Sequence, residues 1–355
     1  MNPLIPTADV IPVSWGWFQF LLLLTLPLHL LCMNALVGSA GIAFYARLRP
    51  GENYRRLAHE LAKMMPFLVA FTINFGVAPL LFNQVLYGQF LYVSSILMGV
   101  FWLAVIPLLI IAYYALYLYD FRFNRLGTAG TLLLALALLV FFAIAFIYTN
   151  NMTLMLDPQK WTAYFGNDSG TLLNLGDPTV IPRYLHFIIG ALAVGGLAVA
   201  LFGKLRGRRD PEVGGLAVEI GMKTFFRLTL VSILAGLWFL VALPREIMLM
   251  FMGGNLLATL TFIVALILVV VVLLAALRNR VYLTTGLAVG LVVLMSFLRA
   301  YVRSGFQGKN FSPNMLEVVP QYGPMILFFV TLVAGVVCIG WMLKQLAGLP
   351  KERRY

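Results

Sequence analysis

Residues 182–196 read Pro-Arg-Tyr-Leu-His-Phe-Ile-Ile-Gly-Ala-Leu-Ala-Val-Gly-Gly, which places a histidine near the start of a bilayer-length apolar run. An ionisable side chain is costly in hydrocarbon, so His186 is a candidate metal or cofactor ligand, or a proton relay. Arg183 lies three residues earlier, one helical turn closer to water. This pattern suits a haem iron bound by His186, with its propionates directed toward Arg183. The alternative is a structural histidine bonded to a carbonyl of a neighbouring helix.

The composition around this stretch is that of a membrane protein. Of the 355 residues, 62% are hydrophobic and 11% are charged. No soluble fold of this size buries so much apolar surface, so we expect a polytopic protein whose main partner is the lipid bilayer. The net charge of +12 is explained by basic loops at one membrane surface, and no nucleic-acid partner is expected.

Nine apolar runs reach the length that spans a bilayer. They carry no alternating polar pattern, so we predict helices rather than barrel strands. The expected fold is an all-α, polytopic membrane helix bundle in which residues 1–355 form a single integral membrane domain. The predicted spans are 14–46, 65–87, 91–119, 127–150, 182–203, 223–243, 247–277, 280–302 and 322–346.

The distribution of lysine and arginine predicts the orientation of these spans. With the N-terminus outside, 19 of the 25 basic residues fall in cytoplasmic segments. Such a bias predicts an N-out, C-in topology and places His186 near the outer face. The six basic residues left outside are Lys160, Arg183, Arg245, Arg299, Arg303 and Lys309.

Two further segments carry candidate ligands. His29 lies in the middle of the first span, two residues after Pro27, a proline that frees a backbone carbonyl. A hydrogen bond to that carbonyl is the structural explanation for His29, and iron ligation is the functional one.

Residues 244–252, Pro-Arg-Glu-Ile-Met-Leu-Met-Phe-Met, open the seventh span at the outer face. Arg245 is a candidate propionate partner, and Met248 a candidate thioether ligand opposite His186, although methionine is also common apolar filler.

Motifs of other classes are missing from the sequence. There is no nucleotide-binding glycine loop, zinc-protease helix or nucleophile elbow. No acidic residue lies mid-span, which disfavours a proton-coupled transporter. Asn74, Pro79 and Gln84 in the second span suggest a broken helix, and they keep a transporter as an alternative.

Five short elements occur in an order typical of one family. They are Leu24-Thr25 with His29 and Gly38, then Ile73–Gly76, Tyr87-Gly88, Asn150–Met152 with Asp157-Pro158, and His186. In these the chain resembles the large subunit of cytochrome bd quinol oxidases over a core of residues 14–243, with additional helices in 247–346. The resemblance implies one or two haems b, ligated by His186 and His29, and quinone as a diffusible substrate.

Departures from that family pattern are equally informative. The third span has no carboxylate between Trp102 and Tyr117, where the family carries glutamates that serve oxygen chemistry. The loop that binds quinol in the family is shortened to about residues 241–247. No glutamate occurs in 296–303 to ligate a high-spin haem, and the family's Arg-x-Met appears only as Arg245-x-x-Met248.

We therefore expect a bd-like, haem b-binding subunit of the bacterial inner membrane. It would pass electrons between the quinone pool and a periplasmic redox partner, such as a multihaem c-type cytochrome, as the quinol-oxidising or quinone-reducing subunit of a complex. The alternatives are a terminal quinol oxidase that reduces oxygen, and a haem-free transporter or assembly subunit.

Overall fold

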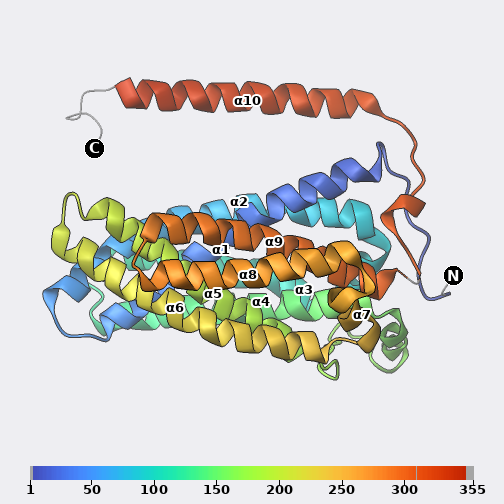
Figure 1. Ribbon diagram of the computed structural model, residues 1–355, viewed down its shortest axis with the longest axis horizontal. Coiled ribbons are helices and arrows are strands. Elements are labelled where there is room, and N and C mark those ends of the chain that lie inside the picture. The colour runs from blue at the N-terminus through green and yellow to red at the C-terminus, as the bar shows by residue number, and fades with distance from the viewer. Residues whose placement is uncertain (1–2, 309, 349–355) are drawn as a thin grey trace.

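The computed structural model describes residues 3–308 and 310–348, and these fold into a long helical bundle (Figure 1). Each long helix contains an apolar run that can cross a membrane, and a helix satisfies its backbone hydrogen bonds internally, as the hydrocarbon requires. The long helices are α1 (Trp15–Arg47), α2 (Glu52–Leu97), α3 (Gly99–Phe121), α4 (Thr128–Leu156), α5 (Val180–Arg206), α6 (Pro211–Ala242), α8 (Leu256–Leu277), α9 (Val281–Gln307) and α10 (Tyr322–Gly348). Short turns are η1 (Pro158–Gly166), α7 (Arg245–Leu249), η2 (Met250–Gly254) and η3 (Pro313–Met315).

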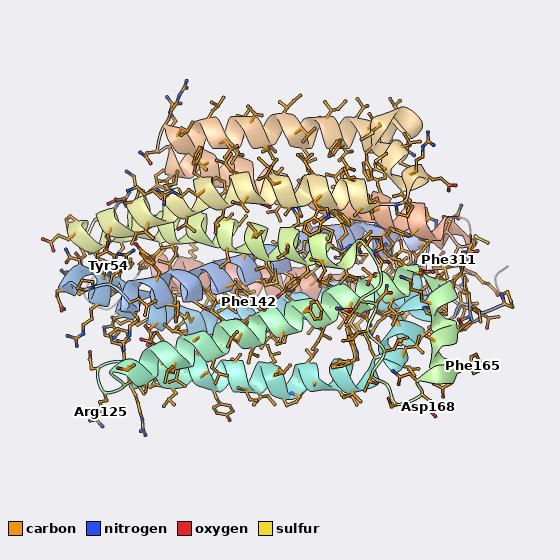
Figure 2. All side chains as sticks on the ribbon, turned by 90° about the horizontal axis from the view of Figure 1, so that it is seen from below. Tyr54, Arg125, Phe142, Phe165, Asp168 and Phe311 are labelled. Carbon is orange, nitrogen blue, oxygen red and sulfur yellow. The ribbon has the colours of Figure 1, made fainter. Side chains whose placement is uncertain are left out.

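The predicted fold class is confirmed. In the described part of the chain, nine helices are long and apolar enough to cross a membrane, and the only β pairing is one isolated bridge. Figure 2 shows Tyr54 and Arg125 at one end of the bundle, and Phe165, Asp168 and Phe311 at the other. We call the first end, where α1 is joined to α2, the basic end, and the second the N-terminal end. The inward orientation of the basic end stays a prediction from charge.

Helix α2 is longer than the sequence predicts. Its 46 residues begin at Glu52, between the first two predicted spans, and run through Pro66 and Pro79 as far as Leu97. The predicted interruption between 87 and 91 appears only as a kink at Tyr87, where φ is −137° and ψ is 29°. The helix is not broken at Asn74 or Pro79, where the backbone stays helical, and the side-chain amide of Asn74 donates a hydrogen bond to the carbonyl of Ala70 one turn earlier.

The predicted seventh span, 247–277, begins too early. The structure instead has a five-residue helix, α7, followed by the π turn η2, and the membrane helix α8 begins only at Leu256. Gly253, with φ of 107°, provides the left-handed turn, and the Asn255 side chain caps the new helix by accepting a hydrogen bond from the Ala258 N–H. Met248 therefore lies outside α8.

Glycines bring the central helices into backbone contact. A Cβ atom on Gly195 of α5 would overlap the backbone of α1 at Asn34 and Gly38. Gly196 and Gly221 bring α5 and α6 together in the same way. Small residues allow the helices to approach this closely. In a bilayer the hydrophobic effect does not drive helices together, so the resulting van der Waals contacts favour their association.

Helix α10 lies apart from the bundle, at its periphery (Figure 1). The start of α10 is held near the start of α1 by backbone hydrogen bonds between the two preceding segments. The N–H of Ile11 donates to Glu317 at 2.8 Å, and the N–H of Val319 donates to Ile11 at 2.9 Å. The rings of Trp17 and Phe329 meet edge to face, with centroids 5.8 Å apart.

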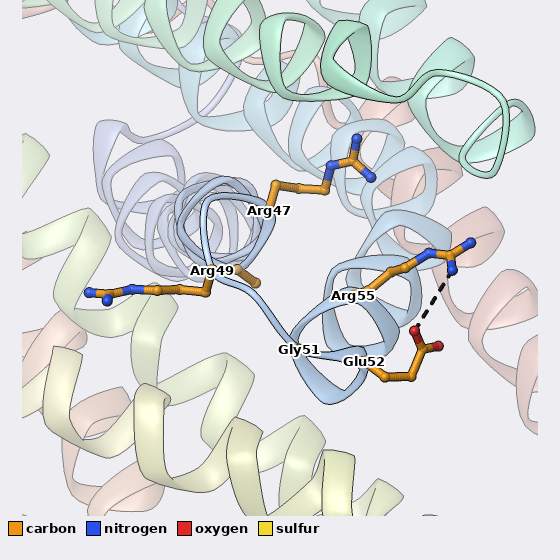
Figure 3. Close-up of a pocket in the computed structure, with 6 residues that line it drawn as sticks. Arg47, Arg49, Gly51, Glu52 and Arg55 are labelled. Atoms are coloured by element: carbon orange, nitrogen blue, oxygen red, sulfur yellow. Dashed lines mark ion pairs between the residues drawn. The ribbon is translucent and has the colours of Figure 1, made fainter.

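Ion pairs between arginines and acidic residues link neighbouring segments at the basic end. Arg56 on α2 forms ion pairs with Asp210 and Glu212 before and within α6. Figure 3 shows the α1–α2 turn, where a pocket of about 360 Å³ is lined by Arg47, Arg49, Gly51, Glu52 and Arg55. Arg55 pairs there with Glu52 at 3.7 Å. This surplus of cations over acids is what a cytoplasmic membrane surface favours.

We predict that Gly195→Ala destabilises the protein by about 1–3 kcal/mol or more, because the new methyl group overlaps the α1 backbone, which cannot move aside as a side chain can. Gly286→Ala on α9 is the matched control, since its Cβ would meet no atom within 4 Å. Thermal unfolding of both variants in detergent checks the difference. Equal midpoints would contradict the close α1–α5 contact.

Candidate functional site

His186 projects from α5 onto α6. Its Nδ1 atom lies 3.0 Å from the carbonyl oxygen of Ser232 and 3.3 Å from the Ser232 hydroxyl. Gly236, one turn further along α6, lies under the ring, and a Cβ there would come within 3.1 Å of the imidazole. The absence of a side chain at Gly236 therefore allows the ring to reach the helix backbone.

His29 repeats this arrangement on a second pair of helices. It projects from α1 onto α2, and its Nδ1 lies 2.9 Å from the carbonyl oxygen of Thr72. Gly76, again one turn beyond the acceptor, leaves room for the ring, because a Cβ there would come within 2.9 Å of it. The acceptor is thus on a neighbouring helix, and not the carbonyl freed by Pro27 in the same helix.

The two contacts determine which nitrogen carries the proton. A carbonyl oxygen can only accept, so Nδ1 of each neutral ring must hold the hydrogen and donate it. The lone pair is then on Nε2. A histidine whose Nδ1–H is bonded to a carbonyl, with Nε2 unprotonated, is oriented for metal ligation. His186 lies six residues into α5, roughly 9 Å from its start, whereas His29 lies fourteen residues into α1, roughly 21 Å from its start.

Three arginines gather near the N-terminal end of the bundle: Arg299 interacts electrostatically with Arg183 and Arg303, and its charge also acts on His29. Arg183 on α5 is buried, and its guanidinium lies over the Phe239 ring at 4.9 Å. Arg303 on α9 is also buried. It donates to Asn83 at 2.9 Å and lies 4.1 Å from the centroid of the Tyr87 ring.

The third arginine, Arg299, lies one turn deeper on α9 than Arg303 and is half-buried. Its Nη2 is 3.1 Å from the sulfur of Met152 on α4. Thioether sulfur is only a weak acceptor, so this contact satisfies little of the guanidinium's donor capacity.

These guanidinium groups lack anionic partners. Among the described residues no carboxylate lies within 4.0 Å of Arg183, Arg299 or Arg303. Asp177, whose charge acts on Arg183, is paired with Lys160 at 3.5 Å. The buried Nε and Nη2 of Arg183 and the buried Nε of Arg303 make no hydrogen bond in the structure.

Buried cations of this kind are strongly destabilising unless something compensates their charge. An anion with several acceptor oxygens would satisfy the free N–H groups and the charge together. The donor set therefore fits the two propionates of a haem, and the lone pair of His186 fits its iron. The described residues contain no group of three His, Cys, Asp or Glu side chains that would hold a bare metal ion.

The sequence-predicted residues fall into two groups. His186 and Arg183 are one turn apart on α5, and Arg183 is close enough to Arg299 for their charges to interact. Arg245 is exposed at the start of α7, and Met248 is half-buried in an apolar cluster with Ile247 and Phe251. Pro244 precedes the five-residue helix α7, and not the long span that the sequence predicts there.

Sequence reasoning missed Arg299 and Arg303. They were grouped with the outer basic residues, although both belong to the last turns of α9 inside an apolar bundle. Their spacing of four residues puts them on one face of the helix. Two arginines at this spacing at the edge of a span were the available signal.

We predict that ¹⁵N NMR of histidine-labelled, haem-free protein will show His29 and His186 protonated at Nδ1 and unprotonated at Nε2. Burial in the bundle disfavours a charged ring, and the carbonyl partner fixes the single proton of the neutral ring on Nδ1. His59, whose ring stacks on Phe123 at 4.4 Å, is the internal control. Detection of an Nε2–H form for His186 would contradict its orientation for iron.

Comparisons with known proteins support the fold. No protein-family model matches the chain, and no curated protein matches its sequence. Among solved structures it is similar to one described as the structure of bd oxidase from Geobacillus thermodenitrificans. The TM-score is 0.69, with 14% identity, 92% of this chain covered and 96% of that chain covered. The chain is thus a multi-pass membrane protein with a bd-oxidase-like fold.

Proposed function

We propose that this chain is a bd-like, haem b-binding membrane subunit that passes electrons between the quinone pool and a periplasmic redox partner. One observation carries the proposal. A membrane histidine with Nδ1–H bonded to a carbonyl and Nε2 unprotonated lies one turn from a buried arginine that has no anionic partner. Bound haem b would supply one-electron transfer at iron.

The residues of the chain would have distinct roles in that site. His186 would offer its Nε2 lone pair to the iron, and the Ser232 carbonyl would hold the ring in place and raise its basicity. Arg183, Arg299 and Arg303 would bind the propionates and balance their charge. Met248 stays the proposed second ligand that would hold the iron, and Arg245 a more exposed residue that would bind a propionate.

A second haem is proposed at His29, whose contacts match those of His186. It would lie closer to the middle of the bilayer, since His29 is further from the N-terminal end of its helix. Two haems at different depths would give electrons a route across part of the membrane. We propose a bacterial inner membrane location and, as the electron partner, a multihaem c-type cytochrome or another periplasmic redox subunit.

The alternative of an oxygen-reducing oxidase is less well supported. Oxygen reduction consumes protons at the haem, and their delivery through a membrane needs titratable groups inside it. Helix α3 has one acidic residue, Asp120, next to its last residue at the basic end. A transporter is disfavoured because α2 is continuous through Asn74 and Pro79.

His186→Ala should abolish the low-spin b-type signal in a reduced-minus-oxidised spectrum, because it removes the iron ligand. The protein should still insert, since the rest of α5 stays apolar. His59→Ala, at the basic end, is the matched control and should leave the signal intact. An unchanged spectrum of the His186 variant would rule out ligation by this residue.

Arg303→Gln should lower the haem midpoint potential by roughly 30–60 mV, because a nearby cation favours the reduced iron and 59 mV corresponds to about 1.4 kcal/mol for one electron. Glutamine keeps a hydrogen-bond donor for Asn83. Arg245→Gln, at an exposed position, should change the potential less. Redox titration of the two variants measures both potentials. A larger change in potential for Arg245→Gln would indicate that the propionates bind near α7 instead.

A further inference from the structure

A membrane-facing groove lies between α2 and α3, away from the arginine cluster. Its volume is about 630 Å³, and most of its wall is apolar or aromatic. Its lining includes Ile73, Leu109, Tyr113, Tyr117, Phe121 and Arg122. The groove runs along α3 from the middle of the helix to its basic end, where Arg122 follows the last helical residue.

Two tyrosine hydroxyls meet inside this groove. The Tyr113 hydroxyl donates to the Tyr117 hydroxyl at 2.9 Å, and the ring centroids are 4.6 Å apart. One hydroxyl proton of the pair remains available for an acceptor. Tyr117 keeps that proton and is four residues before Phe121, the end of α3, whereas Tyr113 is eight residues before it, which puts them roughly 6 Å and 12 Å from the basic end of the helix. Side chains of a helix lean toward its N-terminus, which on α3 is away from the basic end. Tyrosines of an interfacial belt would keep their hydroxyls at headgroup level.

The depth of this pair distinguishes between two classes of ligand. A phospholipid would place its phosphate near Arg122 and its acyl chain against the two hydroxyls. A donor facing an acyl chain stays unsatisfied, which is unfavourable. A neutral, flat ring with carbonyl acceptors would accept the spare hydroxyl proton at that depth and pack against the aromatic wall.

The groove is also next to a proposed haem ligand. Ile73 lines it, and the preceding residue, Thr72, supplies the carbonyl that accepts from His29. His29 approaches α2 from α1, and Tyr113 approaches it from α3. Only α2 separates them, and a helix with its side chains is about 10–12 Å in diameter.

We propose that this groove binds the ring of an isoprenoid quinone. A ring carbonyl would accept from the Tyr113–Tyr117 pair, and the isoprenoid tail would leave past Leu109 into the lipid. The inference deepens the proposed function, on which it rests, by placing the quinone one helix away from His29.

The test uses purified full-length protein in nanodiscs and titration with decylubiquinone, a quinone with a ten-carbon tail. Tyr113→Phe combined with Tyr117→Phe keeps both rings and removes the hydroxyls. This variant should bind decylubiquinone about tenfold more weakly, as expected for loss of a hydrogen bond and its desolvated donor. Tyr92→Phe, an exposed tyrosine elsewhere on α2, is the matched control and should stay within twofold of the unaltered protein.

Arg122→Gln distinguishes the quinone from a phospholipid, the competing ligand. This variant should bind decylubiquinone within twofold of the unaltered protein. Unchanged decylubiquinone affinity in the double tyrosine variant would overturn the inference. So would the finding that anionic phospholipid competes with the quinone for the groove and is released by Arg122→Gln. Haem content is measured on the same samples. Haem-free protein with tyrosine-dependent quinone binding would refute the proposed function alone, and haem-loaded protein with tyrosine-independent binding would refute the groove alone.

Discussion

A histidine inside a membrane needs a partner for its ring N–H, and here a backbone carbonyl of the next helix supplies it twice. Ser232 accepts from His186 and Thr72 accepts from His29, at 3.0 and 2.9 Å. Each contact requires two helices to come together closely enough for a ring to touch a backbone. The glycine one turn beyond each acceptor makes that possible. The packing of α1 on α2 and of α5 on α6 therefore determines the tautomer of both rings, and the tautomer determines what their free nitrogens can bind.

The second constraint is charge. Arg183 and Arg303 are buried with N–H groups that no protein acceptor satisfies, in a bundle end that has no carboxylate within ion-pair distance of them among the described residues. A cost of several kcal/mol for each buried ion makes such an arrangement unfavourable on its own. A dianionic cofactor with an iron would resolve both constraints, since its carboxylates meet the arginines and its metal meets a histidine. On this account the polar end of the bundle is a cofactor site rather than a permeation path.

Composition and charge were sufficient to predict the helical membrane fold, and His186 with Arg183 could be identified because both are unusual in an apolar run. The early start of the predicted seventh span shows what was missed. The Met248–Met252 stretch is as apolar as a helix, but Gly253 and the cap at Asn255 redirect the chain. The partners Ser232 and Thr72 were not predictable, because a backbone carbonyl has no side-chain signature. Arg299 and Arg303 were counted among the basic residues of the outer side, at the edge of the predicted span 280–302, because hydropathy locates the end of a span only to within a turn.

The most direct measurement is a cryo-electron microscopy map of the protein purified from cells that make haem. The account predicts macrocycle density between α5 and its neighbours, with iron bound to Nε2 of His186 and propionates in hydrogen-bond contact with at least two of Arg183, Arg299 and Arg303. Density for lipid or ordered water alone around these arginines, with His186 facing no metal, would contradict it.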